Sequence, residues 1–390
     1  MLKHYTSLSL VMELEEEPKK RLLDKLKQID EQSLQELNAV LLPDFFVDHF
    51  LYLDEIENIF NKIKNIHQQG GGNLPGIKQK IHQGGNAANM ALALAKLGIK
   101  SHLICKTSKF GLNLLNYFLG RNNVDLSGVK TDGELAITTA LEFGEKHTNV
   151  MIGDPGSVAD FAFDILDEKD LETISNSEIV CVLNWNLNKK GTSLAKETFQ
   201  FAKQKNVKTF LDTGDPSPRK NDITDLIKNV LTDNNLDILG VNENELSHYT
   251  NTKSYSDEEI IKSAIQLKNK TKARIDLHTS HFSCTASEKK TIILTQKTLQ
   301  IKRATGAGDA WNAGDIFSEL LGFEDDERLL FANSVAEYYI SSQNPIHPNL
   351  EEISEYFKEG KSDLKNQKSW QSYNISKYKA EKIIDKNTDL

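Results

Sequence analysis

One stretch of the chain, residues 302–322, combines a glycine-rich turn, a helix and a carboxylate. Gly306, Ala307 and Gly308 form the turn, here called the glycine turn, and the residues after it have the apolar spacing of a helix. Free backbone N–H groups and the positive end of the helix dipole meet at such a turn, so it favours a phosphate. Asp309 stands beside it as a candidate general base for an attacking hydroxyl. The alternative is an Asp that only stabilises its own helix.

A second polar stretch, GGNAAN, could hold a polyol. Gly84 and Gly85 allow close backbone approach, and the following residues predict a buried helix over 90–97. Asn86 and Asn89 lie one helical turn apart and point the same way, and amides both donate to and accept from hydroxyl groups. N-capping by Asn86 is the alternative, but it explains neither the glycines nor Asn89.

An aspartate inside an apolar segment is a further candidate. Pro43 introduces residues 44–50, whose aromatic and β-branched content predicts a short buried strand that contains Asp48. A buried carboxylate is costly unless it is paired, hydrogen-bonded or used. Asp48 is therefore either a functional group or a cap at the end of a strand.

From residue 160 onward, predicted strands alternate with predicted helices. Strands are expected at 178–183, 208–212, 238–241 and 273–278, and helices at 194–205, 223–232 and 258–270. This rhythm predicts a mostly parallel sheet with helices on both faces, in which ligands bind beyond the carboxyl ends of the strands. Asp212, Asn242, Glu245 and the glycine turn all fall at such ends. Their shared position favours a functional interpretation.

The segments between these motifs predict further strands and one helix. Strands are expected over 101–106, 134–143 and 146–152, and a helix around 111–121. Residues 51–83 are interpreted as a long β-hairpin with a glycine-rich tip, in preference to a helix over residues 53–66.

The two ends of the chain show no recognisable chemistry. Residues 13–40 predict one or two amphipathic helices, with Leu22 and Leu26 on one face, so residues 1–42 are expected to form a helical extension. In the lysine-rich tail, residues 359–390, the basic residues alternate with acidic ones, which is typical of a solvated segment.

Composition and charge exclude several classes of protein. The 390 residues are 38% hydrophobic and 26% charged, which is ordinary for a globular chain. The net charge of −9, without a basic block, argues against nucleic acid as a partner. Three widely spaced cysteines suit a reducing cytoplasm, and no segment resembles a membrane helix or a signal peptide. The motifs of P-loop ATPases, dinucleotide dehydrogenases and zincins are missing.

Four features together resemble one known family. GGNAANMALALAKLG (84–98) and TGAGDAWNAG (305–314) resemble the two signatures of the ribokinase-like, or PfkB, carbohydrate kinase family, in the family's order. NENE (242–245) resembles the family's N-x-x-E element, and Asp48 fits its substrate-contacting aspartate. The resemblance covers residues 43–358.

The resemblance implies a fold and an activity. Residues 43–358 would form an α/β kinase domain, a three-layer α/β/α sandwich with a small β lid built from about residues 51–83 and 134–152. The domain would transfer the γ-phosphate of ATP to a hydroxyl of a sugar or sugar-like substrate. Mg²⁺ is the implied cofactor, and a monovalent cation is a further candidate. Family members often dimerise through the lid, so a homodimer is an open expectation. Nucleic acid and membranes are not expected partners.

The resemblance also implies a role for each motif residue. Asp309 would be the base, and the glycine turn would be the anion hole for the transferred phosphoryl group. Glu245 would reach Mg²⁺ through water. The substrate would be held by Asp48, Gly85, Asn86 and Asn89, and the nucleotide by Asn242, Thr279, Ser280, Thr305 and Asn333. Positioned oxygens, charge neutralisation and one base suffice for phosphoryl transfer.

Two stretches depart from the family pattern. Arg303 and Ala304 replace the usual residues before Thr305, and residues 278–285 lack the glycines of the usual Thr-x-Gly-x-x-Gly turn at the nucleotide. These departures keep open a catalytically inactive sugar- or nucleotide-binding protein on this fold, although the intact Asp309 favours an enzyme. A nucleoside kinase is the other alternative, because ribose, fructose, a keto-deoxy sugar acid, a sugar phosphate and a nucleoside are all served by similar motifs.

Overall fold

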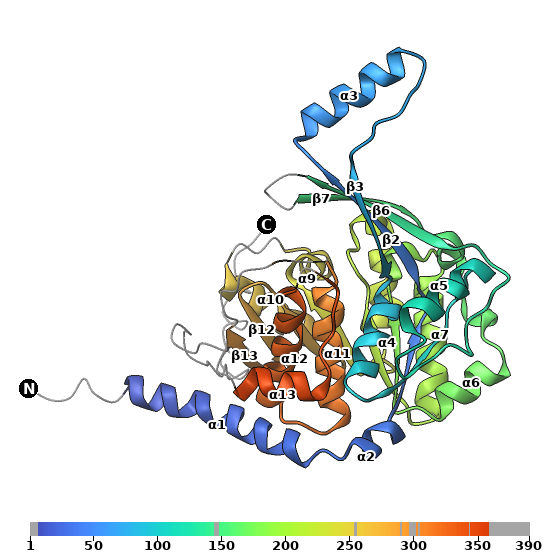
Figure 1. The fold of residues 1–390 in the computed structure, drawn as a ribbon. Coiled ribbons are helices and arrows are strands. Elements are labelled where there is room, and N and C mark those ends of the chain that lie inside the picture. Colours follow the sequence, from blue (N-terminus) through green and yellow to red (C-terminus); the bar gives the residue numbers. More distant parts are fainter. Residues whose placement is uncertain are drawn as a thin grey trace, which may run out of the picture.

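Two β-sheets form the framework of the computed structural model (Figure 1). The structure describes residues 7–143, 148–252, 256–288, 291–295, 302, 305–342 and 344–358. Arg303, Ala304 and the lysine-rich tail lie outside these residues, so the expectations about them stay predictions. Within the described part, no helix is long and apolar enough to cross a membrane.

The larger sheet has nine strands among the described residues, in the order β13-β12-β11-β10-β9-β8-β1-β4-β5. The strands are β1 (Asn38–Leu42), β4 (Lys100–Leu103), β5 (Val124–Asp125), β8 (Ile179–Leu183), β9 (Lys208–Asp212), β10 (Ile238–Asn242), β11 (Arg274–His278), β12 (Phe282–Ala286) and β13 (Thr291–Thr295). Neighbouring strands from β5 to β11 are parallel, and β12 and β13 add antiparallel pairs at one edge. The predicted mostly parallel sheet is confirmed.

Helices cover both faces of this sheet because its strands direct alternate side chains to opposite faces. In β1, Val40 and Leu42 join one apolar core, whereas Ala39 and Leu41 join the other. The first core packs against α6 (Glu168–Ser175), α7 (Gly191–Gln204), α8 (Ile223–Leu226), α9 (Glu243–Thr250) and α10 (Asp257–Lys268). The second packs against α1 (Ser7–Gln28), α4 (Asn86–Lys96), α5 (Lys109–Leu119), α11 (Ala307–Leu320), α12 (Asp325–Ile340) and α13 (Leu350–Lys358). The predicted three-layer α/β/α sandwich is confirmed.

The smaller sheet, here called the lid sheet, has four strands in the order β3-β2-β6-β7. They are β2 (Phe46–Leu53), β3 (Lys78–Gly84), β6 (Ala136–Phe143) and β7 (Thr148–Asp154). The pair β2–β6 is parallel and the other two pairs are antiparallel. Asp48 therefore lies on the second strand of the chain and in the lid sheet, not on a first strand of the core.

The predicted hairpin over residues 51–83 is wrong in its middle. β2 and β3 do pair, but α3 (Ile56–Gln68) lies between them and extends beyond the lid sheet (Figure 1). Ile56, Phe60 and Ile63 recur at helical spacing. This local pattern is a stronger signal than the glycine cluster after it, which had suggested a hairpin.

The predicted helical extension, residues 1–42, is wrong at its C-terminal end. The helices stop at α2 (Glu31–Glu36), and β1 is an inner strand of the large sheet between β8 and β4. Residues 39–42 are all buried, because both faces of β1 are covered. The sequence of such a strand is a continuous apolar run without alternation. The predicted helices over residues 13–40 therefore extended too far, because Val40 belongs to β1.

Helix α11, which begins in the glycine turn, is fastened by buried ion pairs. Asp315 of α11 and Asp276 of β11 both pair with Arg328 of α12, and the Arg328–Asp276 distance is 3.1 Å. One helical turn further along α11, Glu319 accepts a hydrogen bond from Arg274 Nη1 at 2.6 Å. Buried charges are tolerated only where they are paired in this way. The network therefore fixes α11 against both β11 and α12.

Candidate functional site

Asp309 lies in the first turn of α11, where its side chain is 8% exposed. Its Oδ2 accepts a hydrogen bond from Asn89 Nδ2 of α4 at 2.9 Å. Burial raises the pKa of Asp309 well above the usual range, and the nearby carboxylates of Asp212, Asp44 and Asp48 raise it further. The bond from Asn89 opposes this shift in the pKa of Asp309. A carboxylate with raised proton affinity in a site is suited to general-base chemistry.

The glycine turn has the backbone geometry of an anion-binding site. Gly306 adopts the left-handed region, with φ of 85°, and α11 begins at the next residue. The first amides of a helix have no carbonyl partner inside it, and the positive end of the helix dipole lies beside them. Ala307, Gly308 and Asp309 are the first three residues of α11. The turn therefore places free amides and the carboxylate within one helical turn.

Asp44, which the sequence did not single out, holds the N-terminus of α4. Its carboxylate accepts from Asn86 N at 2.9 Å, from Ala87 N at 2.9 Å and from Asn184 Nδ2 at 2.7 Å. Gly85 occupies the N-cap position with φ of 92°, so Asn86 is not the cap. The available signal was an acidic residue placed directly after Pro43, but its partners are distant in sequence.

Two of the predicted substrate contacts, Asp48 and Asn89, lie near the predicted base. The Asp48 carboxylate lies against Gly84, where a Cβ atom would come within 2.2 Å of Asp48 Oδ1, so any side chain at position 84 would displace this carboxylate. Asn89 Oδ1 accepts from Gln83 Nε2 of β3 at 3.2 Å while its Nδ2 donates to Asp309. Asn89 thus joins the lid sheet to α11.

Asn242 and Glu245 form a capping box at the start of α9. Asn242 Oδ1 accepts from Glu245 N at 3.0 Å, and Glu245 accepts from Asn242 N at 3.0 Å and from Asn242 Nδ2 at 2.7 Å. Burial, and next the charge of Asp212, raise the pKa of Glu245 well above the usual range. Asn312 Nδ2 holds Asp212 at 2.5 Å. Asn242 therefore uses its amide within α9 instead of presenting it freely to a nucleotide.

These oxygen donors suit a hydrated Mg²⁺. Carboxylate oxygens are the protein ligands that Mg²⁺ prefers, and Mg²⁺ usually keeps several waters. A nearby divalent cation would also relieve the repulsion between the buried Asp212 and Glu245. Among the described residues, no group of three or more His, Cys, Asp or Glu side chains is arranged to hold a metal ion directly. A contact of Glu245 through water is the form that these residues fit.

Two predicted nucleotide contacts lie in the tight turn between β11 and β12. Thr279 Oγ1 donates to Phe282 O at 2.9 Å and accepts from His281 N at 3.1 Å and from Phe282 N at 3.0 Å. Ser280 is exposed at the tip of the turn. The Thr279 hydroxyl therefore closes a hairpin that has no glycine, which leaves Ser280 as the more accessible group.

The other two predicted nucleotide contacts lie beside aromatic side chains. Asn333 Oδ1 accepts from Trp311 Nε1 at 2.8 Å, so this amide oxygen holds an indole of α11. Thr305 O accepts from Tyr339 Oη at 3.3 Å. Thr305 directly precedes the glycine turn, and each of the two residues is tied to α11 or α12 by at least one polar atom.

Comparison with known proteins shows the family of this chain. The family model described as pfkB family carbohydrate kinase matches residues 50–352, so the chain belongs to that family. A 5-dehydro-2-deoxygluconokinase of Clostridium beijerinckii is 25% identical over 303 residues, which are 73% of this chain and 86% of the relative.

Solved structures of kinases share the fold. Arabidopsis thaliana ribokinase, complexed with ribose and ATP, has a TM-score of 0.65 at 20% identity, covering 83% of this chain and 98% of that one. Adenosine kinase of Sinorhizobium meliloti has a TM-score of 0.66 at 14% identity, covering 84% and 98%. The chain is therefore an ATP-dependent carbohydrate kinase by family, as predicted. A sugar kinase and a nucleoside kinase both share the fold, so the fold alone does not determine which acceptor this chain phosphorylates.

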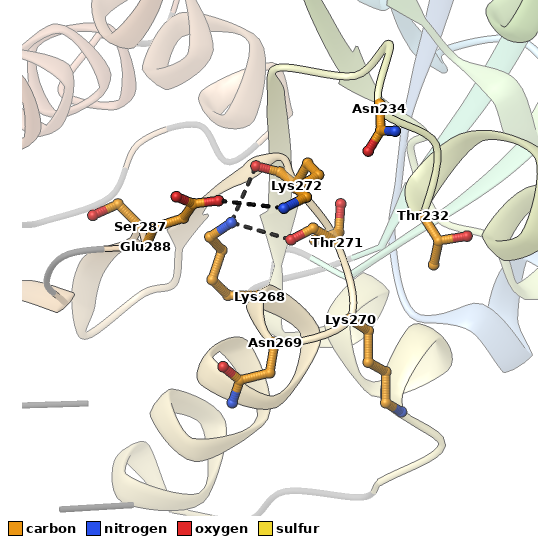
Figure 2. Close-up of a pocket in the computed structure, with 9 residues that line it drawn as sticks. All are labelled: Thr232, Asn234, Lys268, Asn269, Lys270, Thr271, Lys272, Ser287 and Glu288. Carbon is orange, nitrogen blue, oxygen red and sulfur yellow. Dashed lines mark hydrogen bonds and ion pairs between the residues drawn. The ribbon is translucent and has the colours of Figure 1, made fainter. Parts of the chain in front are cut away.

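A separate pocket of about 470 Å³ lies beside the large sheet, at the amino ends of β10 and β11 (Figure 2). Its lining comes from the segments before β10 and β11 and after the antiparallel β12, and includes Thr232, Asn234, Lys268, Lys272 and Glu288. Lys268 Nζ donates to the carbonyls of Thr271 at 3.1 Å and Lys272 at 3.0 Å. This lysine therefore closes the loop into β11, and the pocket is remote from the strand ends that carry Asp212 and Asn242.

The first prediction concerns the anchor of α4. Asp44→Ala should lower the free energy of unfolding by roughly 2–4 kcal/mol, because two helix amides and the Asn184 amide lose a buried acceptor. Urea denaturation followed by circular dichroism measures the loss. Asp30→Ala, which removes the exposed N-cap of α2, is the matched control and should cost no more than about 1 kcal/mol. Equal losses in the two variants would contradict the role given to Asp44.

Proposed function

We propose that this kinase phosphorylates a hydroxyl of a sugar or sugar acid, with Asp309 as the general base and the glycine turn as the anion hole. The observation that carries the proposal is the hydrogen bond of 2.9 Å between Asn89 of α4 and Asp309 of α11. It brings a side chain suited to sugar hydroxyls next to a buried carboxylate of raised proton affinity. Both lie beside the first amides of a helix, which suit the incoming phosphoryl group.

In this reaction the acceptor oxygen attacks the γ-phosphorus of ATP as its proton moves to Asp309. The bond between the γ-phosphorus and its bridging oxygen breaks, and ADP leaves with the electron pair. Asp48, Gly85, Asn86 and Asn89 hold the acceptor from α4 and the lid sheet. The amides of the glycine turn stabilise the charge on the transferred group, the term that usually dominates such catalysis.

Mg²⁺, a monovalent cation and a cytoplasmic location belong to the same proposal on family grounds. Mg²⁺ would neutralise charge on the phosphates, with Glu245 holding one of its waters and Asp212 nearby. Nucleotide contacts remain proposed for Asn242, Thr279, Ser280, Thr305 and Asn333.

The acceptor is best sought first among keto-deoxy sugar acids. The Clostridium relatives are named 5-dehydro-2-deoxygluconokinases, and two of them are 25% and 24% identical to this chain. Release of ADP from ATP with Mg²⁺ would be measured with 5-dehydro-2-deoxygluconate, ribose, fructose and adenosine. Turnover with a sugar or sugar acid supports the proposal, turnover with adenosine alone supports a nucleoside kinase, and tight binding without turnover supports an inactive binding protein.

The second prediction tests the base. Asp309→Asn should lower kcat by about 10²–10⁴-fold, the range expected when a general base is removed, while acceptor binding survives. Steady-state kinetics gives kcat, and calorimetry gives the affinity for the acceptor. Asp164→Asn, at an exposed carboxylate, should behave as the unmodified chain does. An active Asp309→Asn variant would remove Asp309 from the mechanism.

The third prediction uses the raised pKa of Asp309. The base must be ionised, so kcat/KM should fall as the pH drops through that raised pKa. Asn89→Ala removes a hydrogen bond that favours the ionised form, so the acid limb should move to higher pH. Asp212→Asn removes a like charge, so the limb should move to lower pH. Shifts in the same direction, or none, in variants that remain folded would contradict the assignment.

We also propose that two copies associate through the lid sheet and α3. The outer side of the sheet exposes large apolar side chains, among them Ile81 at 59% and Ile152 at 58%, and α3 exposes Phe60 at 55%. Large apolar side chains exposed to solvent can mark an interaction site, and a twofold axis lets one patch cover its own copy. Both elements belong to the same lid, so one interface would cover them together.

The fourth prediction tests this association. Light scattering should give twice the chain mass of 43.9 kDa, and the double variant Ile81→Glu, Ile152→Glu should give the single mass. Tyr117→Glu changes an apolar side chain that is 79% exposed on α5, outside the lid, and should leave the dimer intact. A chain that already has the single mass would overturn the proposal.

A further inference from the structure

Both glycines of the glycine turn pack against ring-bearing side chains from other elements. A Cβ atom at Gly306 would lie 2.6 Å from Tyr339 Oη, and one at Gly308 would lie 3.1 Å from His278 Nε2. Tyr339 comes from α12 and His278 from the end of β11. The absence of side chains at the two glycines therefore lets a hydroxyl and an imidazole approach the turn directly.

His278 is held in this position by two further residues. Its ring stacks on Trp311, with 5.0 Å between centroids and 28° between planes. Trp311 Nε1 donates to Asn333 Oδ1 at 2.8 Å, which fixes the indole. The imidazole is thus set by contacts that join β11, α11 and α12, so it keeps one orientation beside Gly308.

The polarity of this ring is not explained by packing. His278 Nδ1 is buried without a hydrogen-bond partner in the described structure, which destabilises the folded chain. A phenyl ring would stack on Trp311 without that cost. Burial lowers the pKa of His278 to about 4, so the neutral ring carries a single N–H near pH 7. An orphaned buried N–H is rarer than an orphaned acceptor, which favours the tautomer with the proton on Nε2.

We infer that His278 donates its Nε2–H to an oxygen of the phosphoryl group bound at the glycine turn, adding a side-chain donor to the backbone amides. The inference rests on the proposed function, in which that turn is the anion hole. It also gives a role to the first residue of the stretch 278–285, where the chain lacks the glycine-rich nucleotide turn of its family. A hydrogen bond that strengthens as charge develops lowers the barrier and leaves acceptor binding unchanged.

The fifth prediction compares two variants. His278→Phe keeps a ring on Trp311 but loses the donor, so kcat should fall about 10²–10³-fold, while the KM for the acceptor should stay nearly unchanged. The thermal midpoint should stay the same or rise, because the unpartnered Nδ1 is gone. His278→Gln places an amide donor near the position of Nε2 and should recover part of kcat.

The control is His281→Phe, at an exposed histidine in the same hairpin, and it should leave kcat unchanged. A folded His278→Phe variant with full kcat would overturn the inference and reduce His278 to packing. A folded His278→Phe variant that cannot be rescued by Gln would also overturn it. Asp309→Asn tests the proposed function separately, because a failure there concerns the base and not the donor at residue 278.

Discussion

The site depends on keeping four carboxylates buried near one another. Asp44, Asp48, Asp212 and Asp309 are each no more than 8% exposed, and Asp309 experiences the charge of the other three. Such burial is stable only where hydrogen-bond donors meet the carboxylates. Two helix amides and Asn184 hold Asp44, Asn312 holds Asp212, and Asn89 holds Asp309. Burial, and after it the repulsion from the other three carboxylates, raises the pKa of Asp309, and a raised proton affinity is the property a base needs.

The parts of the site that follow local rules could be predicted from the sequence. Gly85 and Gly306 both adopt a left-handed conformation that glycine tolerates best, and each directly precedes a helix. The alternation of strands and helices after residue 160 predicted β8 to β11. It therefore also predicted that Asp212 and Asn242 lie at the carboxyl ends of parallel strands. Glycine spacing and strand ends can both be recognised from a few consecutive residues. The two signature stretches and the strand ends that carry the site could therefore be predicted without the structure.

The parts that depend on distant contacts could not be predicted. Asp44 binds residues 42, 43 and 140 positions away, and no local pattern marks those partners. The position of His278 beside the glycine turn depends on the packing of β11 against α11, because its neighbour Gly308 is 30 residues away in the sequence. β1 was misread for a different reason, since a strand buried on both faces has no alternation to distinguish it from a helix.

The two halves of the site are supported differently. The phosphate side is built on α11, which Arg328 and Arg274 fasten to the sheet through Asp315, Asp276 and Glu319. Donors that are already in place stabilise developing charge without reorganising, so ion pairs beneath the glycine turn support catalysis indirectly. The acceptor side is built partly on β2 and β3 of the lid sheet, a sheet distinct from the one under α11. Asn89 contacts both halves, because its Oδ1 accepts from Gln83 of the lid sheet and its Nδ2 donates to Asp309 of α11, so one amide connects the two proposed halves of the site.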